Sequence, residues 1–332
     1  MKLYKKILLT SAVIIIFVSI YTISLIFLPK KVNEVLIEIK KGETALSIAR
    51  KLYDKDIIRS IKSFYLYVKL TDSEGTLSFG KYLFLGKLSM KDVISRIEAG
   101  RVELKKVTIP EGLTIKRTSK LFARKGFGDY LKFIEVCNDS VFAKKLTGFS
   151  IKTLEGFLYP ETYHFPEEVS EKYIISHLVR EFFNQTSHLD FVPSEKLDFY
   201  DIIILASIVE REARVEDEKP TIASVYVNRL NYNYKLQADP TIAYALEKSG
   251  KTRKKIYYRD LNVNSPYNTY KNYGLPPTPI CNPPVSSIEA VLNPAETDYF
   301  FFFATGTGRH EFTRTYDQHI HQLRIMRTGN GK

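Results

Sequence analysis

The residues best suited to acid–base chemistry follow an apolar run. The stretch Ile202–Ala213, IIILASIVEREA, holds seven apolar residues and one serine around the acids Glu210 and Glu212. A carboxylic acid beside an apolar wall has a raised pKa and can donate a proton near neutral pH, whereas a glutamate at the polar end of a helix is commonly solvated or ion-paired. The two acids fall on different faces of the predicted helix, so periodicity leaves open which one is buried.

Both helices and strands are predicted around this helix, which indicates an α+β fold. Alternation predicts a strand in VLIEI, and the C-terminal segment predicts a strand, a glycine turn, a second strand and a helix. Between Ser265 and Pro284 six prolines interrupt the chain, and loops this long are commonly functional. Periodicity and caps predict helices over Ala45–Leu52, Ser60–Leu70, Ser89–Gly100, Thr114–Phe122, within Gly126–Phe149, and over Glu171–Asn184, Ile202–Arg214 and Asp239–Leu246.

The first thirty residues predict a membrane anchor. Ile7–Pro29 contains no charged residue, and about 20 apolar residues suffice for a helix to cross the hydrocarbon core. Its hydroxyl side chains can bond back to their own helix, and the segment lacks the small-residue pattern of a signal-peptide cleavage site. Lysines flank both ends, so orientation rests on the long C-terminal part, which we expect outside the cytoplasm.

Composition restricts the class of protein. The 332 residues are 44% hydrophobic and 26% charged, as in globular domains, and the formal net charge of +12 suits anionic lipid, nucleic acid or an acidic polymer. An extracytoplasmic location removes nucleic acid as the expected partner. Cys137 and Cys281 show no metal-ligand spacing, so we expect no metal and no cofactor, and whether they form a disulfide stays open.

Several motifs in fixed order carry a family resemblance. EGFLYPETY, ASIVEREA, VYVNRL, LQADPTIAYAL, SPYNTYKNYGLPPTPICNP and ATGTGRHEF resemble the MltG (YceG-like) family of endolytic murein transglycosylases. The resemblance implies a cytoplasmic tail at 1–6, an anchor at 7–29, a LysM-like peptidoglycan-binding subdomain at 35–104 and a catalytic domain at 105–332. It also implies a single-pass protein of the inner membrane, acting on peptidoglycan glycan strands and partnered by peptidoglycan synthases (penicillin-binding proteins).

The family chemistry implied by this resemblance needs one carboxyl group. A lytic transglycosylase cleaves the β-1,4 bond from N-acetylmuramic acid to N-acetylglucosamine and leaves a 1,6-anhydro end. The resemblance assigns the catalytic role to Glu210, as general acid and then base, with a pKa raised by the preceding Ile208 and Val209. We expect Glu212 to be structural and paired with a nearby arginine.

Other polar and aromatic residues of the motifs are candidates for binding the substrate. Amides, hydroxyls and carboxylates suit N-acetyl groups and sugar hydroxyls, and tyrosines can stack on sugar faces because tryptophan is absent. Asp239 also fits a helix cap before Pro240, and Asn228 fits a support for Glu210. The candidates are Tyr159, Glu161, Tyr163, Asn228, Gln237, Asp239, Tyr267, Asn268, Thr269, Tyr270 and His310.

Two alternatives stay open on the sequence. A non-catalytic peptidoglycan-binding scaffold would need no acid. A hydrolytic muramidase would need a second carboxylate, for which Glu161 or Asp239 is available, while Glu155 and Glu161 also suit a structural role that accepts backbone N–H bonds in a tight loop. The products separate these possibilities, because they carry anhydro ends, reducing ends or no new ends.

Overall fold

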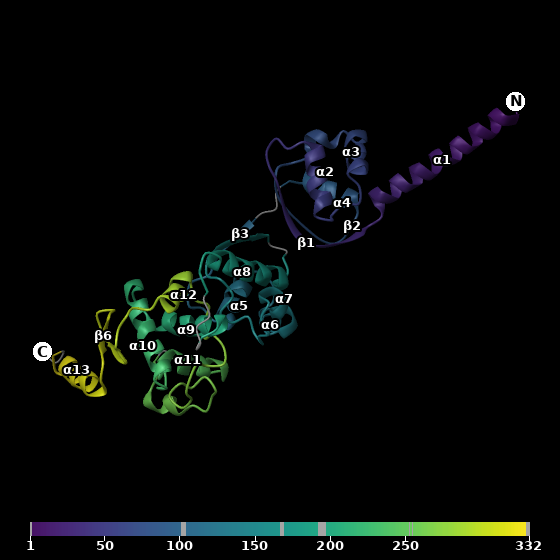
Figure 1. The fold of residues 1–332 in the computed structure, drawn as a ribbon. Coiled ribbons are helices and arrows are strands. Elements are labelled where there is room, and N and C mark those ends of the chain that lie inside the picture. The colour runs from purple at the N-terminus through teal and green to yellow at the C-terminus, as the bar shows by residue number, and fades with distance from the viewer. Residues whose placement is uncertain are drawn as a thin grey trace. The chain divides into compact units, whose positions relative to one another are not determined.

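The computed structural model describes residues 2–100, 104–166, 169–191, 197–251, 253 and 255–329. The chain divides into two compact units (Figure 1). Unit 1 comprises Met1–Lys105 with His164–Val169, and unit 2 comprises Lys106–Tyr163 with Ser170–Lys332. The assignment of wall binding to the first unit and catalysis to the second stays a prediction.

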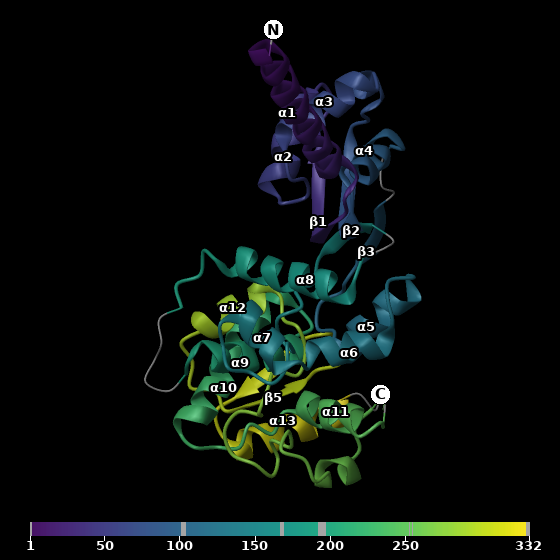
Figure 2. The same ribbon diagram turned by 90° about the vertical axis from the view of Figure 1, so that its right-hand side faces the viewer.

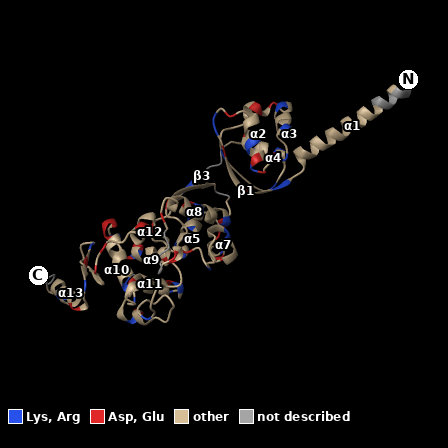
Figure 3. Ribbon diagram, viewed as in Figure 1, with Lys and Arg blue, Asp and Glu red and all other residues tan. Residues whose placement is uncertain are grey.

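The N-terminal helix α1 (Lys2–Phe27) is long and apolar enough to cross a membrane. Its segment Leu9–Phe27 has 19 residues and a mean hydropathy of 2.4, and no charged residue interrupts it (Figure 3). The hydroxyls of Thr22 and Ser24 donate to the carbonyls of Val18 and Tyr21 at 2.9 and 2.7 Å, as predicted for polar residues within such a span.

Unit 1 packs helices against a two-stranded antiparallel sheet. The strands are β1 (Lys30–Ile39) and β2 (Gly80–Leu88), and their register pairs Ile37 with Tyr82. The helices are α2 (Ala45–Asp54), α3 (Ile61–Leu70) and α4 (Met90–Glu98), joined by the 3₁₀ turn η1 (Ser73–Thr76). Each helix begins after a hydroxyl side chain that accepts a backbone N–H, which confirms the predicted starts.

Unit 2 is mainly helical. Its strands β5 (Phe301–Ala304) and β6 (His310–Thr313) form an antiparallel hairpin. The strands β3 (Leu104–Thr108) and β4 (Thr162–Pro166), which pair with each other, each include residues of both units. Two further 3₁₀ turns are η2 (Glu216–Glu218) and η3 (Tyr258–Asn262). The helices are α5 (Ile115–Arg124), α6 (Tyr130–Cys137), α7 (Ser140–Thr147), α8 (Glu171–Thr186), α9 (Phe199–Glu212), α10 (Lys219–Asn231), α11 (Asp239–Lys248), α12 (Val285–Leu292) and α13 (Tyr316–Gly329).

Helix α9 lies at the centre of unit 2, where it packs against α10, α11 and α12 (Figure 2). Residues 202–209 are all buried, so the apolar run of the sequence is the core of this unit. The single serine in the run, Ser207, accepts the backbone N–H of Ile280 at 2.9 Å. It thereby fixes the proline-rich segment 263–284, which contains no regular helix or strand.

Close backbone contacts hold the loops of unit 2 together. The side-chain oxygen of Asn282 accepts the N–H groups of Gly156 and Leu158 at 2.9 and 3.0 Å, and its amide donates to the carbonyl of Leu113 at 2.8 Å. Gly156 has φ +95°, and a Cβ there would lie 2.6 Å from the ring of Pro279. Only glycine fits this approach of two motif segments.

Candidate functional site

Helix α9 presents both candidate acids at its C-terminal end. It begins with a capping box in which Asp198 and Asp201 exchange side-chain-to-backbone hydrogen bonds, and it ends where Ala213 becomes extended. Two residues of a helix that are two positions apart point in different directions. Glu210 and Glu212 therefore enter different environments.

Glu210 is ion-paired. Its Oε2 lies 3.1 Å from the Lys219 ammonium and accepts the Ser287 hydroxyl at 2.8 Å. The Lys219 side chain is only 4% exposed and also contacts Glu216 at 2.6 Å. The predicted apolar surroundings of Glu210 are therefore wrong at the carboxylate itself, because a buried lysine from the start of α10 reaches it. The neighbouring Glu111 has its pKa raised by burial and by the charge of Glu210.

Glu212 lies at the wall of a cavity of about 320 Å³. The Tyr226 hydroxyl donates to its Oε1 at 2.8 Å. Burial raises the pKa of Glu212 to about 7, against the opposing effects of the Tyr226 hydrogen bond and of Arg229 and Arg211. The predicted arginine pairing is wrong, because Tyr226 is the hydrogen-bonding partner and no arginine forms an ion pair with Glu212 among the described residues.

Four of the predicted substrate-binding residues meet Glu212 in this cavity. They are Gln237, Asp239, Tyr270 and His310. The Tyr270 hydroxyl donates to Asp239 at 2.6 Å. Asp239 is the first residue of α11 and the cap position is Ala238, so the helix-cap alternative for Asp239 is wrong.

His310, on β6, is oriented by an acid of the 3₁₀ turn η2. Its Nδ1 lies 2.8 Å from Glu218 Oε2, and its backbone N–H donates to Glu218 Oε1 at 3.1 Å. A carboxylate that holds one ring nitrogen fixes the orientation of the imidazole and leaves Nε2 for other partners. The sequence offered no signal for this pairing, because the two residues lie 92 positions apart.

The other predicted binding residues serve the scaffold. Asn228 donates to the carbonyls of Thr297 and Tyr299 at 2.9 and 3.0 Å, so it anchors a loop and does not support Glu210. Buried Asn268 donates to two carbonyls of its own loop, and Thr269 accepts the N–H of Ala238.

Three predicted tyrosines and Glu161 also lie outside the cavity. The predicted stacking role is wrong for three of them, which are under a tenth exposed: Tyr159, Tyr163 and Tyr267. Glu161 accepts the N–H of Thr162 at 2.8 Å and is not among the residues that line the cavity with Glu212.

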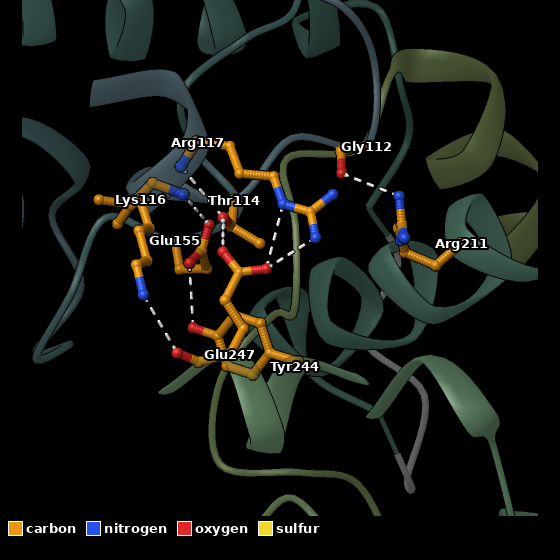
Figure 4. Close-up of polar contacts among 9 residues, drawn as sticks. Gly112, Thr114, Lys116, Arg117, Glu155, Arg211, Tyr244 and Glu247 are labelled. Carbon is orange, nitrogen blue, oxygen red and sulfur yellow. Dashed lines mark hydrogen bonds and ion pairs between the residues drawn. The ribbon is translucent and has the colours of Figure 1, made fainter. Parts of the chain in front are cut away.

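A second group of buried carboxylates stabilises the contact between α5 and α11 (Figure 4). Glu155 accepts the Ile115 N–H at 2.7 Å and the Tyr244 hydroxyl at 2.9 Å, which confirms its predicted structural role. Burial raises the pKa of Glu155 to about 8. Glu247 accepts the Thr114 hydroxyl at 2.9 Å and binds Arg117 at 2.8 Å.

The two cysteines are free and buried. Burial raises the pKa of both thiols, so neither has the character of a reactive thiolate. Within the described ranges, no three His, Cys, Asp or Glu side chains gather where a metal ion could be held.

Residues that the sequence did not single out complete the site. Tyr226 and Arg229 come from α10, and Phe302 and Phe303 come from β5. The motif VYVNRL contained both α10 residues, and their spacing of three places them on one helix face, which is the signal that could have found them.

The chain is similar to known proteins along most of its length. The model of the YceG-like family matches residues 37–324. An endolytic murein transglycosylase of Bacillus subtilis is 32% identical over 302 residues, 85% of this chain and 82% of that protein. One from Streptococcus pneumoniae is 27% identical over 86% of this chain, and the match spans 57% of its own length.

A solved structure has the same fold. The crystal structure of a putative yceG-like protein from Listeria monocytogenes superposes with a TM-score of 0.60 at 32% identity, covering 87% of this chain and 98% of that one. The match to the family model extends over far more than half of the sequence. The chain therefore belongs to the YceG-like family.

Proposed function

We propose that this chain is a membrane-anchored endolytic murein transglycosylase whose single general acid and base is Glu212. The relatives from Bacillus subtilis and Streptococcus pneumoniae match 85% and 86% of this chain, and both are named endolytic murein transglycosylase. One observation carries the residue assignment. Among the acids that line the cavity, Glu212 combines a half-buried position, a pKa raised to about 7 and a place in the same cavity as four motif residues.

The chemistry follows from that pKa. Protonated Glu212 donates its proton to the glycosidic oxygen as the bond from C1 of N-acetylmuramic acid breaks. The resulting carboxylate takes the proton of the C6 hydroxyl, whose oxygen bonds to C1 and closes the 1,6-anhydro ring. No water is consumed, and the proton count on Glu212 is restored. One group serves both steps best when its pKa lies near the working pH.

Glu210, the residue predicted from the sequence, is the second candidate. Its carboxylate pairs with Lys219 of α10 and accepts the hydroxyl of Ser287 of α12, so it already connects three helices. We propose that Glu210 positions the end of α9 by fixing the start of α10 and α12 to it. It then acts through the placement of Glu212.

The role of Asp239 distinguishes transglycosylation from hydrolysis. It lines the same cavity as Glu212, so it is the acid that a hydrolytic muramidase would use as its second carboxylate. The Tyr270 hydroxyl at 2.6 Å occupies one of its oxygens. We propose that the Asp239–Tyr270 pair binds sugar hydroxyls. We also propose that Nε2 of His310, on strand β6, binds a sugar hydroxyl.

The proposed setting is the outer face of the cytoplasmic membrane. Helix α1 supports an anchor by length and composition. An anchored enzyme meets glycan strands as they leave the membrane, where peptidoglycan synthases are the expected partners. Unit 1 is proposed to hold the strand as a LysM-like subdomain, and a pure scaffold function remains the alternative if no cleavage occurs.

The test compares two isosteric variants. Glu212→Gln keeps an oxygen for the Tyr226 hydroxyl, so we expect an intact fold and loss of cleavage of uncrosslinked glycan strands by about 10³-fold or more. Glu210→Gln keeps an acceptor for Ser287 and Lys219, and we expect cleavage to persist at a reduced rate. Strand cleavage is followed by chromatography, and folding by circular dichroism. Full activity of Glu212→Gln with an inactive Glu210→Gln would reassign the acid to Glu210.

A further inference from the structure

A second and larger cavity adjoins the one that contains Glu212. Its volume is about 720 Å³, within the range of small-molecule sites. Four residues line both cavities, namely Arg229, Gln237, Tyr270 and Phe302. The two spaces are therefore neighbours that share part of their lining, and a linear ligand long enough to reach both would contact this shared wall.

Exposed tyrosines mark this second cavity. Four of them line it, and we call the space the tyrosine cleft: Tyr232, Tyr234, Tyr273 and Tyr316. Tyr273 and Tyr316 are each 61% exposed, and the Lys235 ammonium lies 5.0 Å from the Tyr273 ring. Large exposed rings on a concave surface are characteristic of binding sites, because they offer apolar area together with a hydroxyl at low entropic cost.

The shared wall contains Gln237, a polar residue that is exposed to solvent. Gln237 adopts φ 49°, a left-handed conformation that is uncommon outside glycine and clusters at functional sites. Its side-chain amide has no hydrogen bond to any residue in the described part of the chain.

Arg229 adds a positive charge to the same wall. It is 7% exposed, and its guanidinium donates to the carbonyls of Phe300 and Leu236. No carboxylate pairs with it among the described residues. The guanidinium also lies over the rings of Tyr226 and Phe301, at 5.9 and 5.5 Å. A buried cation without a paired carboxylate can favour an anionic or strongly polar ligand.

We propose that the tyrosine cleft binds the saccharide units that adjoin the cleaved bond, with tyrosine rings on the sugar faces and Gln237 on acetamido or hydroxyl groups. This inference rests on the proposed function, since the strand must reach Glu212. It implies that a substrate has to extend through both cavities. Strands long enough to do so bind better than short fragments, which is the preference that an enzyme cutting within strands requires.

The test measures binding apart from cleavage. Full-length Glu212→Gln in detergent micelles is mixed with uncrosslinked glycan strands of four or eight sugars, and native mass spectrometry reports bound strand and cleaved strand separately. Adding Tyr273→Ala or Tyr316→Ala is expected to weaken binding of the longer strand roughly three- to tenfold each. The control is Tyr258→Ala, because Tyr258 is 91% exposed and lines neither cavity.

The outcomes separate this inference from the catalytic assignment. Unchanged affinity in both tyrosine variants, or an equal loss in Tyr258→Ala, would overturn the tyrosine cleft as a saccharide site. Loss of binding confined to the cleft variants and to the longer strand supports it. Cleaved strand in the Glu212→Gln sample would refute the role of Glu212, and the ratio of affinities among the variants would still decide the cleft.

Discussion

Replacement of Glu212 by glutamine is expected to make unit 2 more stable in alkali. The pKa of Glu212 is raised from 4.5 to about 7 in the folded protein. Between these values the folded state binds more protons than the unfolded state, so stability falls as pH rises. At about 1.4 kcal/mol for each pH unit, the free energy of unfolding of the wild type falls by about 3 kcal/mol, nearly all of it by pH 8.5. The variant has no carboxyl group at this position, so its free energy of unfolding lacks this decrease.

The assay is urea unfolding of the full-length protein at pH 5 and pH 8.5. Unfolding is monitored by hydrogen-exchange mass spectrometry of peptides from α9, so that only unit 2 is observed. The stability difference between variant and wild type should rise by about 2 to 3 kcal/mol from the lower to the higher pH. Glu135→Gln, an exposed change on α6, is the matched control. A difference that does not depend on pH would show that Glu212 titrates normally and would refute the reasoning.

Three further outcomes are expected. Tyr226→Phe removes a hydrogen bond that lowers the pKa of Glu212, so the alkaline limb of the pH–rate profile should move to higher pH; an unmoved limb contradicts this coupling. Glu247→Gln weakens the bond to Arg117 and should lower the free energy of unfolding by about 1 kcal/mol in urea titrations, and an unchanged value would count against it. A chain that starts at Lys31 should leave the membrane fraction yet still cleave strands in solution; retention in the membrane would place the anchor elsewhere.

Local signals predicted the helices well because their starts and faces are encoded nearby. Thr114 caps α5 as predicted, and the alternation in VLIEI lies within β1. The C-terminal strand, turn, strand and helix appear in the predicted order as β5, β6 and α13. Asp239 is both a binding candidate and a possible cap in the sequence, because Pro240 suits either of the first positions of a helix; the helix begins one residue earlier, with Ala238 at the cap.

The site depended on long-range contacts that periodicity does not contain. Helix periodicity does not distinguish Glu210 from Glu212, and Lys219 pairs with Glu210 only because α10 folds back onto α9. His310 meets Glu218 across 92 positions. The loops that bring Gln237 and Tyr270 to the cavity are fixed by backbone hydrogen bonds such as that from Gln237 to Thr269 at 3.1 Å. The sequence motifs contain most of the residues that line the cavity. Which of these residues lie together, and which contacts they make, follows only from the fold.

The most direct test of the account is mass spectrometry of the products that the full-length protein releases from intact, uncrosslinked glycan strands. The account predicts saccharide ends one water lighter than hydrolysis products, formed by the wild type and missing with Glu212→Gln. Reducing ends would contradict it, because water would then be the nucleophile and Asp239 the second carboxylate to examine.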